Sequence, residues 1–298
     1  MRTIKSLSLL LLLPLFISCA ALAPKNSYAY RALSIEQIIS DEDKPLGTVE
    51  ELRYHCSVPG PSERRLIVYL PHNYHDSDKR YPVTYMLHGA RGHETSWITK
   101  GNIISITDSL TSRGLAEESI IVMPNMNQYK NDRDYDNSRM KTALESLLEI
   151  DGTVESSFVH DVVELVDSVY RTIPDKEHRA IGGLSVGALQ TLFISASSPD
   201  IFGYVGLFSP MPRAITKHSA YSNFYKSRNS KIARQFENPP LLYLIMIGKA
   251  DFFHPHVNNF SKFLNRHDFM HSYIKTSGGH DWYNWKNYYI KLIESVFK

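Results

Sequence analysis

Short apolar runs alternate with amphipathic stretches along the chain from about residue 65 onward. Each apolar run is rich in β-branched or aromatic residues and stops at a proline, a glycine or a polar loop, which predicts a strand. The predicted strands span 65–70, 82–87, 119–123, 178–184, 204–208, 241–247 and 272–275. Because these runs are continuously apolar, we expect a mostly parallel sheet that is covered on both faces.

The stretches between the strands have the apolar spacing of helices. Helices are predicted over 103–113, 186–197, 255–266 and 281–297, and another from an apolar stripe at Phe158, Val162, Leu165, Val166 and Val169. Strands that alternate with helices predict an α/β fold, with a mostly parallel central sheet and helices on both faces. Two polar stretches, 125–154 and 211–238, interrupt this order. They follow strand ends and are expected to be either substrate walls or solvated insertions.

The first residues have the pattern of an export signal. Arg2 and Lys5 precede an apolar run over 9–17 that is too short to span a membrane. Two cleavage positions fit. A lipoprotein signal over 1–18 leaves Cys19 as the lipidated first residue, whereas a signal peptide over 1–29 ends at a small-x-small site. We therefore expect an outer-membrane or cell-surface lipoprotein, or a periplasmic or secreted protein, with a short linker and a single domain over 45–298.

Charge and cysteine content limit the possible partners. Lys and Arg total 33 and Asp and Glu total 31, a net charge of +2. Cleavage before Cys19 removes Arg2 and Lys5, which brings the two signs into balance. This balance gives no electrostatic case for nucleic acid as a partner, and we expect a small or neutral substrate. With Cys19 outside the domain, Cys56 is a lone thiol and no internal disulfide is expected.

The segment Gly183-Leu184-Ser185-Val186-Gly187 matches the pattern G-x-S-x-G where a predicted strand passes into a helix. Such a turn presents a serine hydroxyl at the edge of the sheet. A serine needs a histidine base, and the histidine needs an acid, in the chain order Ser, Asp, His. Asp251 follows the strand over 241–247, and His280 follows the strand over 272–275. The predicted catalytic residues are therefore Ser185, Asp251 and His280.

An oxyanion hole needs two backbone N–H groups near the serine. We expect one from Val186 and one from Ala90, in the loop His88-Gly89-Ala90-Arg91-Gly92. The substrate contacts proposed from the sequence are Gly89, Arg91, Trp97 and Trp282. Trp97 fits a core position equally well, and the helical spacing of Trp282 with Trp285 fits the core better. His254 and His256 lack a third metal ligand nearby, so no metal or organic cofactor is implied.

Several motifs together resemble the esterase D family of α/β-hydrolases, which includes feruloyl and acetyl xylan esterases, S-formylglutathione hydrolases and mycolyltransferases. The motifs lie at 69–74, 81–89, 122–125, 178–185 and 278–285. The resemblance implies an α/β-hydrolase fold, the roles of Ser185, Asp251 and His280 given above, and oxyanion donors at Ala90 and Val186. Val186-Gly187-Ala188 stands where relatives commonly have Met and two glycines. Arg91 is similar to an arginine of the mycolyltransferases.

The resemblance implies a secreted serine esterase that removes feruloyl or acetyl groups from polysaccharide or oligosaccharide esters through an acyl-enzyme. Its partner would be an acylated carbohydrate or another small ester, with membrane attachment through a lipidated Cys19. Three alternatives remain at this point: an acyltransferase to a sugar acceptor, a peptidase on the same fold, and a carbohydrate-binding lipoprotein without turnover.

Overall fold

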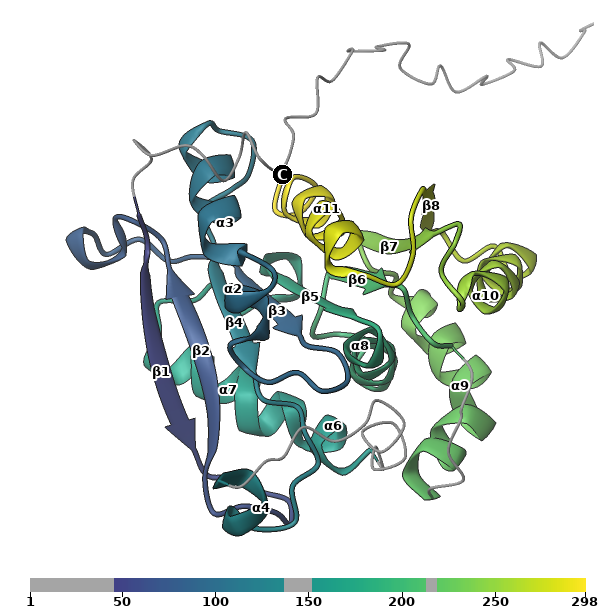
Figure 1. The fold of residues 1–298 in the computed structure, drawn as a ribbon, viewed down its shortest axis with the longest axis horizontal. Coiled ribbons are helices and arrows are strands. Elements are labelled where there is room, and N and C mark those ends of the chain that lie inside the picture. The colour runs from purple at the N-terminus through teal and green to yellow at the C-terminus, as the bar shows by residue number, and fades with distance from the viewer. Residues whose placement is uncertain (1–45, 137–151, 213–218) are drawn as a thin grey trace, which may run out of the picture. The chain divides into compact units, whose positions relative to one another are not determined.

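The computed structural model describes residues 46–136, 152–212 and 219–298 (Figure 1). The predicted signal peptide and Cys19 lie outside these residues, as do parts of the two polar stretches, 137–151 and 213–218. Cys56 lies within them as a free, half-buried thiol whose S–H donates to Asp161.

The described residues form one 8-stranded sheet in the order β1-β2-β4-β3-β5-β6-β7-β8. The strands are β1 (Thr48–Tyr54), β2 (Arg64–Leu70), β3 (Val83–Leu87), β4 (Ile120–Pro124), β5 (Arg179–Leu184), β6 (Tyr204–Phe208), β7 (Leu242–Gly248) and β8 (Ser272–Thr276). Strands β3 to β8 run parallel, while β2 is antiparallel to both of its neighbours. The prediction of a mostly parallel central sheet is confirmed.

Helices cover both faces of the sheet. They are α2 (Ser96–Thr99), α3 (Ile103–Ser112), α4 (Asp132–Asp136), α6 (Thr153–Phe158), α7 (Glu164–Val169), α8 (Val186–Ser197), α9 (Ser219–Glu237), α10 (His254–Arg266) and α11 (Trp282–Ile293). Helices α3 and α11 pack together on one face (Figure 1), where Leu292 fills the space left by Gly182 and Gly206. On the other face the apolar side chains of the strands pack on α6, α7, α8 and α10.

The order of the strands predicts that a ligand binds at the carboxyl ends of the parallel strands. Strand β3 lies between β4 and β5, so the chain leaves it first toward one side and later returns on the other. At such a switch point the loops after neighbouring parallel strands diverge and leave a crevice at their carboxyl ends. The loops after β3, β5, β7 and β8 carry His88 to Gly92, Ser185, Asp251 and His280, in that order.

The sequence predicted the bounds of α8 and β6 as the structure has them, but it missed β1 and α9. Strand β1 is an edge strand with a mostly exposed surface, so it lacks a continuous apolar run. Helix α9 is rich in Ser, Asn and Arg and buries Ile232 and Gln235 as its described core contacts. Neither segment carries the hydrophobic period that predicts an element.

The stripe predicted from Phe158 to Val169 is wrong at its end. A π-helical turn, η2 (Val159–Val163), joins α6 to α7. Its wider turn shifts the register, so Val163 is buried at 2% exposure and Val169 is 50% exposed. An uninterrupted α-helical spacing could not anticipate this shift.

The first turn of α8 lies directly against the backbone that follows β3. A Cβ on Gly187 would lie 2.4 Å from the carbonyl oxygen of His88 and 2.5 Å from that of Leu87. Both atoms belong to the backbone and cannot rotate away. This glycine is therefore required by contact, and not by its own φ angle.

The substitution Gly187→Ala is expected to lower the free energy of unfolding by about 2 kcal/mol or more, because overpacking against backbone forces the helix and the loop apart. Urea unfolding followed by circular dichroism measures this loss. Gly279→Ala is the matched control, since its Cβ would meet nothing closer than 3.7 Å, and it should leave stability within about 0.5 kcal/mol. Equal losses in the two variants would contradict the argument.

Candidate active site

Ser185 stands in a strained turn between β5 and α8. Its φ is 53° and its ψ is −113°, a left-handed conformation that a residue with a side chain rarely adopts. The backbone N–H of Ser185 donates to the carbonyl of Phe208 over 2.9 Å, which ties the turn to the end of β6. The hydroxyl is thereby held at the carboxyl edge of the sheet, as the G-x-S-x-G pattern predicts.

The structure brings Ser185, His280 and Asp251 into one hydrogen-bonded chain. His280 Nε2 lies 2.9 Å from Ser185 Oγ, and His280 Nδ1 lies 2.9 Å from Asp251 Oδ2. A carboxylate only accepts, so Nδ1 carries the proton and donates to Asp251. Nε2 is then left with a lone pair for the hydroxyl proton of Ser185. The arrangement can move a proton from the serine to the imidazole.

Asp251 is an ionised group in a buried position, with 3% of its surface exposed. Burial raises the pKa of its carboxyl, but hydrogen bonds from His280, from the N–H of Phe253 and from Ser209 outweigh burial. The net result is a pKa below the ordinary value of an aspartate. Asp251 is therefore a carboxylate at neutral pH, as an orienting partner of the imidazole must be.

The loops that carry Asp251 and His280 are bound to each other. The N–H of Ala250 donates to the carbonyl of Gly278 over 3.0 Å, and Gly278 has a φ of 82° that favours glycine. Asn284 of α11 donates from its side chain to the carbonyl of Gly279 over 2.8 Å. Asp281 caps α11 by accepting from the N–H of Asn284. The position of His280 thus depends on both β7 and α11.

Two residues that support the triad, Ser209 and Trp285, were not predicted from the sequence as site residues. Ser209 is fully buried with a φ of 48° and contacts Asp251 through its hydroxyl. Trp285 donates from Nε1 to Ser209 Oγ over 3.2 Å, and its ring stands perpendicular to that of His280 at 4.9 Å. A lone serine after a strand gives no signal in the sequence.

The predicted oxyanion loop lies against the serine. A Cβ on Gly89 would lie 2.5 Å from Leu184 Cδ1 and 3.4 Å from Ser185 Cβ, so the backbone of the loop lies close to the nucleophile turn. Ala90 is half-buried and packs against the cluster that contains Val186. The two residues proposed as oxyanion donors therefore lie next to each other beside Ser185.

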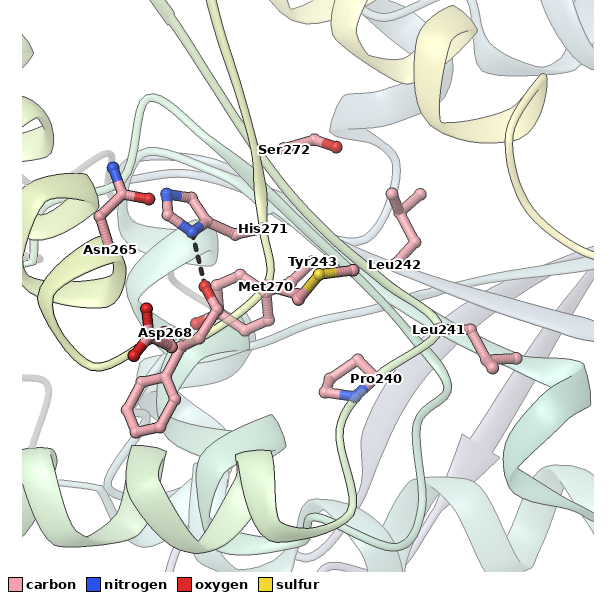
Figure 2. Close-up of a pocket in the computed structure, with 10 residues that line it drawn as sticks. Pro240, Leu241, Leu242, Tyr243, Asn265, Asp268, Met270, His271 and Ser272 are labelled. Carbon is pink, nitrogen blue, oxygen red and sulfur yellow. Dashed lines mark hydrogen bonds between the residues drawn. The ribbon is translucent and has the colours of Figure 1, made fainter. Parts of the chain in front are cut away.

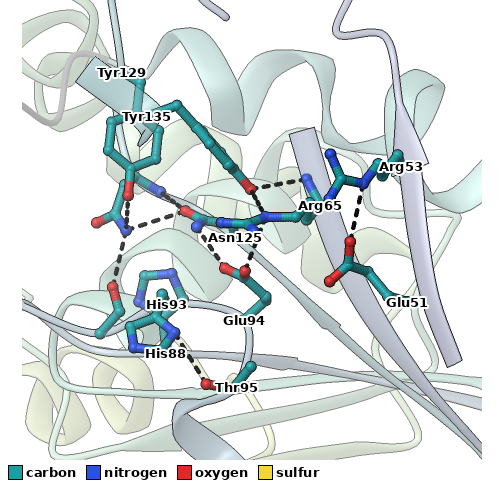
Figure 3. A network of polar contacts seen from close by, with 12 residues as sticks. Glu51, Arg53, Arg65, His88, His93, Glu94, Thr95, Asn125, Tyr129 and Tyr135 are labelled. Atoms are coloured by element: carbon teal, nitrogen blue, oxygen red, sulfur yellow. Dashed lines mark hydrogen bonds and ion pairs between the residues drawn. The ribbon is translucent and has the colours of Figure 1, made fainter. Parts of the chain in front are cut away.

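A buried polar network binds this loop to β2 and to the residues that follow β4 (Figure 3). Glu94 is 5% exposed; it lies 3.2 Å from Arg65 Nε and accepts from Asn125 Nδ2 over 2.6 Å. Asn127 donates to the carbonyl of Gly92 over 2.9 Å. His88, on the same loop, is fully buried, and this burial lowers its pKa to about 4. His88 is therefore neutral at pH 7.

The remaining predicted contacts differ in exposure. Trp97 is 1% exposed, donates from Nε1 to the carbonyl of Leu87 and packs edge-on against Trp282. This placement corrects the expectation of a substrate contact for Trp97, which supports β3 from within the core. Trp282 is half-buried. Arg91 is exposed with a φ of 60°, and its side chain has no hydrogen bond or ion pair among the described residues.

One exposed aromatic residue at the site was not predicted. Phe252 directly follows Asp251, is 65% exposed, and its ring centroid lies 4.5 Å from that of His280. The phenyl ring therefore borders the triad on its solvent side. The sequence signal was only a pair of phenylalanines after the predicted acid.

A separate cavity of about 490 Å³ opens at the opposite edge of the sheet (Figure 2). It lies at the amino ends of β7 and β8, between residues 240–243 and 268–272, so it is remote from Ser185. Among the described residues no group of three or more His, Cys, Asp or Glu side chains is placed to hold a metal ion. No helix in the described ranges is long and apolar enough to cross a membrane.

Sequence comparisons relate the chain to known esterases and xylanases. The family model described as "Putative esterase" matches residues 60–291. The chain is 27% identical over 280 residues to an endo-1,4-beta-xylanase/feruloyl esterase of Xylanibacter ruminicola, with 92% of this chain and 33% of that protein covered. It is also 27% identical over 159 residues to endo-1,4-beta-xylanase Y of Acetivibrio thermocellus, covering 50% and 13%. The chain thus spans a third or less of these curated relatives.

Solved structures agree with the fold. A ferulic acid esterase of the anaerobic fungus Anaeromyces mucronatus matches with a TM-score of 0.69 and 25% identity, covering 86% of this chain and 92% of that one. An S-formylglutathione hydrolase of Staphylococcus aureus matches with a TM-score of 0.63 and 18% identity, over 84% and 96% of the two chains. The α/β-hydrolase fold expected from the sequence is confirmed.

The buried His88 makes stability depend on pH. Its pKa is about 4 in the folded protein and near 6.5 in the unfolded chain, so between these values only the unfolded chain binds the proton. The free energy of unfolding is expected to fall as the pH drops from 6.5 to 4, by roughly 3 kcal/mol from this group. Urea unfolding at pH 7 and pH 4 measures the fall, which should be smaller in the His88→Asn variant. An equal fall in both proteins would contradict this.

Proposed function

The chain belongs to the "Putative esterase" family, and we propose that it is a serine carboxylic-ester hydrolase that removes feruloyl groups from polysaccharide or oligosaccharide esters. The observation that carries the proposal is the hydrogen-bonded chain from Ser185 through His280 to Asp251 at the carboxyl edge of the sheet. Relatives named as feruloyl or ferulic acid esterases support the acyl group.

In the first step, Ser185 Oγ attacks the ester carbonyl while His280 Nε2 accepts the hydroxyl proton. The carbonyl oxygen becomes an oxyanion, which accepts hydrogen bonds from the N–H groups of Ala90 and Val186. The tetrahedral intermediate collapses, the bond to the sugar oxygen breaks, and His280 returns its proton to that oxygen. The sugar alcohol leaves, and the acyl group remains on Ser185 as an ester.

In the second step, water replaces the sugar alcohol. His280 accepts a proton from the water, whose oxygen attacks the acyl carbonyl, and the same two N–H groups receive the oxyanion. Collapse of this intermediate returns the proton to Ser185 Oγ and releases the free acid. Asp251 remains ionised throughout and stabilises the imidazolium of His280, since its pKa lies below the usual value.

An exposed aromatic side chain beside the triad suits an aromatic acid. Phe252 exposes 65% of its surface beside the ring of His280, an arrangement that leaves an apolar face in water. An aromatic acyl group can stack on that face, whereas an acetyl group is too small to do so. This supports a feruloyl group over an acetyl group as the preferred substrate.

We also propose that the domain over 45–298 acts after export, either as a lipoprotein acylated at Cys19 or as a protein cleaved after Ala29. The basic start and short apolar run of the sequence support export. Mass spectrometry of the mature N-terminus tests the two forms. An acylated Cys19 supports the lipoprotein, a start at Tyr30 supports the cleaved form, and an intact Met1 contradicts both.

Ser185→Ala is expected to reduce kcat for methyl ferulate by at least about 1,000-fold, because the nucleophile is removed while the oxyanion donors remain. The thermal melting temperature should stay near that of the wild type, since only one hydroxyl is lost. Hydrolysis followed by chromatography of released ferulate measures the rate. A variant that turns over at the wild-type rate would exclude Ser185 as nucleophile.

Phe252→Ala is expected to raise KM for methyl ferulate by about 5- to 10-fold, the loss of one aromatic contact. KM for 4-nitrophenyl acetate, with its small acyl group, should change less than about twofold. The matched control is Tyr283→Ala, which removes an aromatic side chain of similar exposure, 67%, and should change neither value. Equal effects on both esters would show that Phe252 does not select the acyl group.

A further inference from the structure

His88 makes two hydrogen bonds, one from each ring nitrogen, in the buried space behind the oxyanion loop. The backbone N–H of Met126, after β4, lies 3.0 Å from His88 Nε2. His88 Nδ1 lies 2.9 Å from the carbonyl oxygen of Gly89, the next residue. No step of the proposed hydrolysis uses this imidazole, which is 3% exposed.

The two bonds fix the tautomer of His88. Met126 offers an N–H, which can only donate, so Nε2 must accept with its lone pair. In a neutral imidazole the proton then sits on Nδ1. Nδ1–H faces a carbonyl oxygen, which can only accept. Both bonds are therefore satisfied by one tautomer, and the other tautomer would break both.

The bond to the Gly89 carbonyl sets the direction of the next N–H group. The carbonyl of Gly89 and the N–H of Ala90 belong to one peptide unit, and none of the peptide bonds that the structure describes is cis. In a planar trans peptide these two groups point in opposite directions. The Gly89 carbonyl points back into the loop, where it accepts from His88 and from the N–H of Gly92. The N–H of Ala90 must then point out of the opposite side.

We propose that His88 is a positioning residue for the oxyanion hole: by donating from Nδ1 to the Gly89 carbonyl, it turns the N–H of Ala90 toward the substrate carbonyl beside Ser185. The inference rests on the proposed function, since it takes Ala90 as an oxyanion donor. His88 itself touches neither the substrate nor the triad.

The anchor of His88 is also connected to the nucleophile helix. The carbonyl of Met126 accepts from Gln190 Nε2 of α8 over 3.2 Å, and Gln190 donates from the same nitrogen to Glu155 over 2.7 Å. Met126 thus contacts the oxyanion loop through its N–H and α8 through its carbonyl. This connection fixes the position of the Ala90 donor relative to Ser185, the N-cap residue of α8. Asn125 and Asn127 bind the later part of the loop, at Glu94 and Gly92 (Figure 3).

Two amide substitutions separate the two bonds of His88. In H88N the amide nitrogen occupies the place of Nδ1 and can still donate to the Gly89 carbonyl. In H88Q the amide oxygen reaches the place of Nε2 and can accept from Met126, but no donor remains for Gly89. H271Q is the matched control, because His271 is another histidine with bonds from both ring nitrogens and it lines the remote cavity of Figure 2.

We expect H88Q to lower kcat for methyl ferulate by about 100-fold with KM changed less than about twofold, the pattern of a lost oxyanion contact. The kcat of H88N should lie within about tenfold of the wild-type value, because its amide can still donate to the Gly89 carbonyl. H271Q should leave kcat and KM unchanged. A trifluoromethyl ketone, which forms an oxyanion adduct with serine, should bind H88Q more weakly by a factor similar to the loss in kcat. The affinity for free ferulate should not change.

Nitrogen-15 NMR of the wild-type protein at pH 7 tests the tautomer independently of any variant, and so applies even if H88Q does not fold. A protonated Nδ1 with an unprotonated Nε2 at His88 supports the inference. The opposite tautomer, an imidazolium, wild-type kcat in H88Q, or equal losses of kcat in H88N and H88Q each overturn it. Failure of a fluorophosphonate to label Ser185 in the wild type would instead contradict the proposed function, and the tautomer would still be read directly.

Discussion

The site depends on a contact between two stretches of backbone that have no side chains between them. Gly187, at the start of α8, lies against the carbonyls of Leu87 and His88, and Gly89 lies against Leu184 and Ser185. A Cβ at Gly187 would meet backbone that cannot rotate away and would push the start of α8, where Ser185 stands, away from this loop. Because a misplacement of about 1 Å can lower kcat by about 100-fold, this contact would set the geometry of the proposed hydrolysis before any acid–base chemistry takes place.

A second constraint follows from the first, since close backbone contact removes water from polar groups that must then bond within the protein. The Gly89 carbonyl is satisfied by His88 and by the N–H of Gly92. Glu94 is satisfied by Arg65 and Asn125, so its buried charge is paired and not isolated. The network in Figure 3 thus meets the requirement that burial creates, and it stiffens the loop at the same time.

The sequence predicted the parts of this site that depend on local pattern and chain order. The glycines around Ser185, together with the change from strand to helix, predicted Ser185 as the nucleophile, and the order of strands pointed to the loops of Asp251 and His280, which the structure brings together with it. The sequence did not locate Ser209, because its role depends on a contact with Trp285 across the fold. It likewise could not show that Trp97 is buried in the core against β3, since a tryptophan there fits substrate and core equally well.

The buried polar groups of the site are constrained by many hydrogen bonds, whereas the exposed groups are not. The structure therefore restricts the catalytic roles of residues more than it restricts the choice of substrate. Asp251 and His88 are almost fully buried, and their bonds leave each of them one possible protonation state at neutral pH. Phe252 and Arg91 instead face solvent at the rim, where few contacts constrain them. A rim residue can change without disturbing the hydrogen bonds beneath it, so one catalytic frame can accept different acyl groups. Under the proposed function, Phe252 and other rim residues would therefore select the ester, and the buried frame would cleave it.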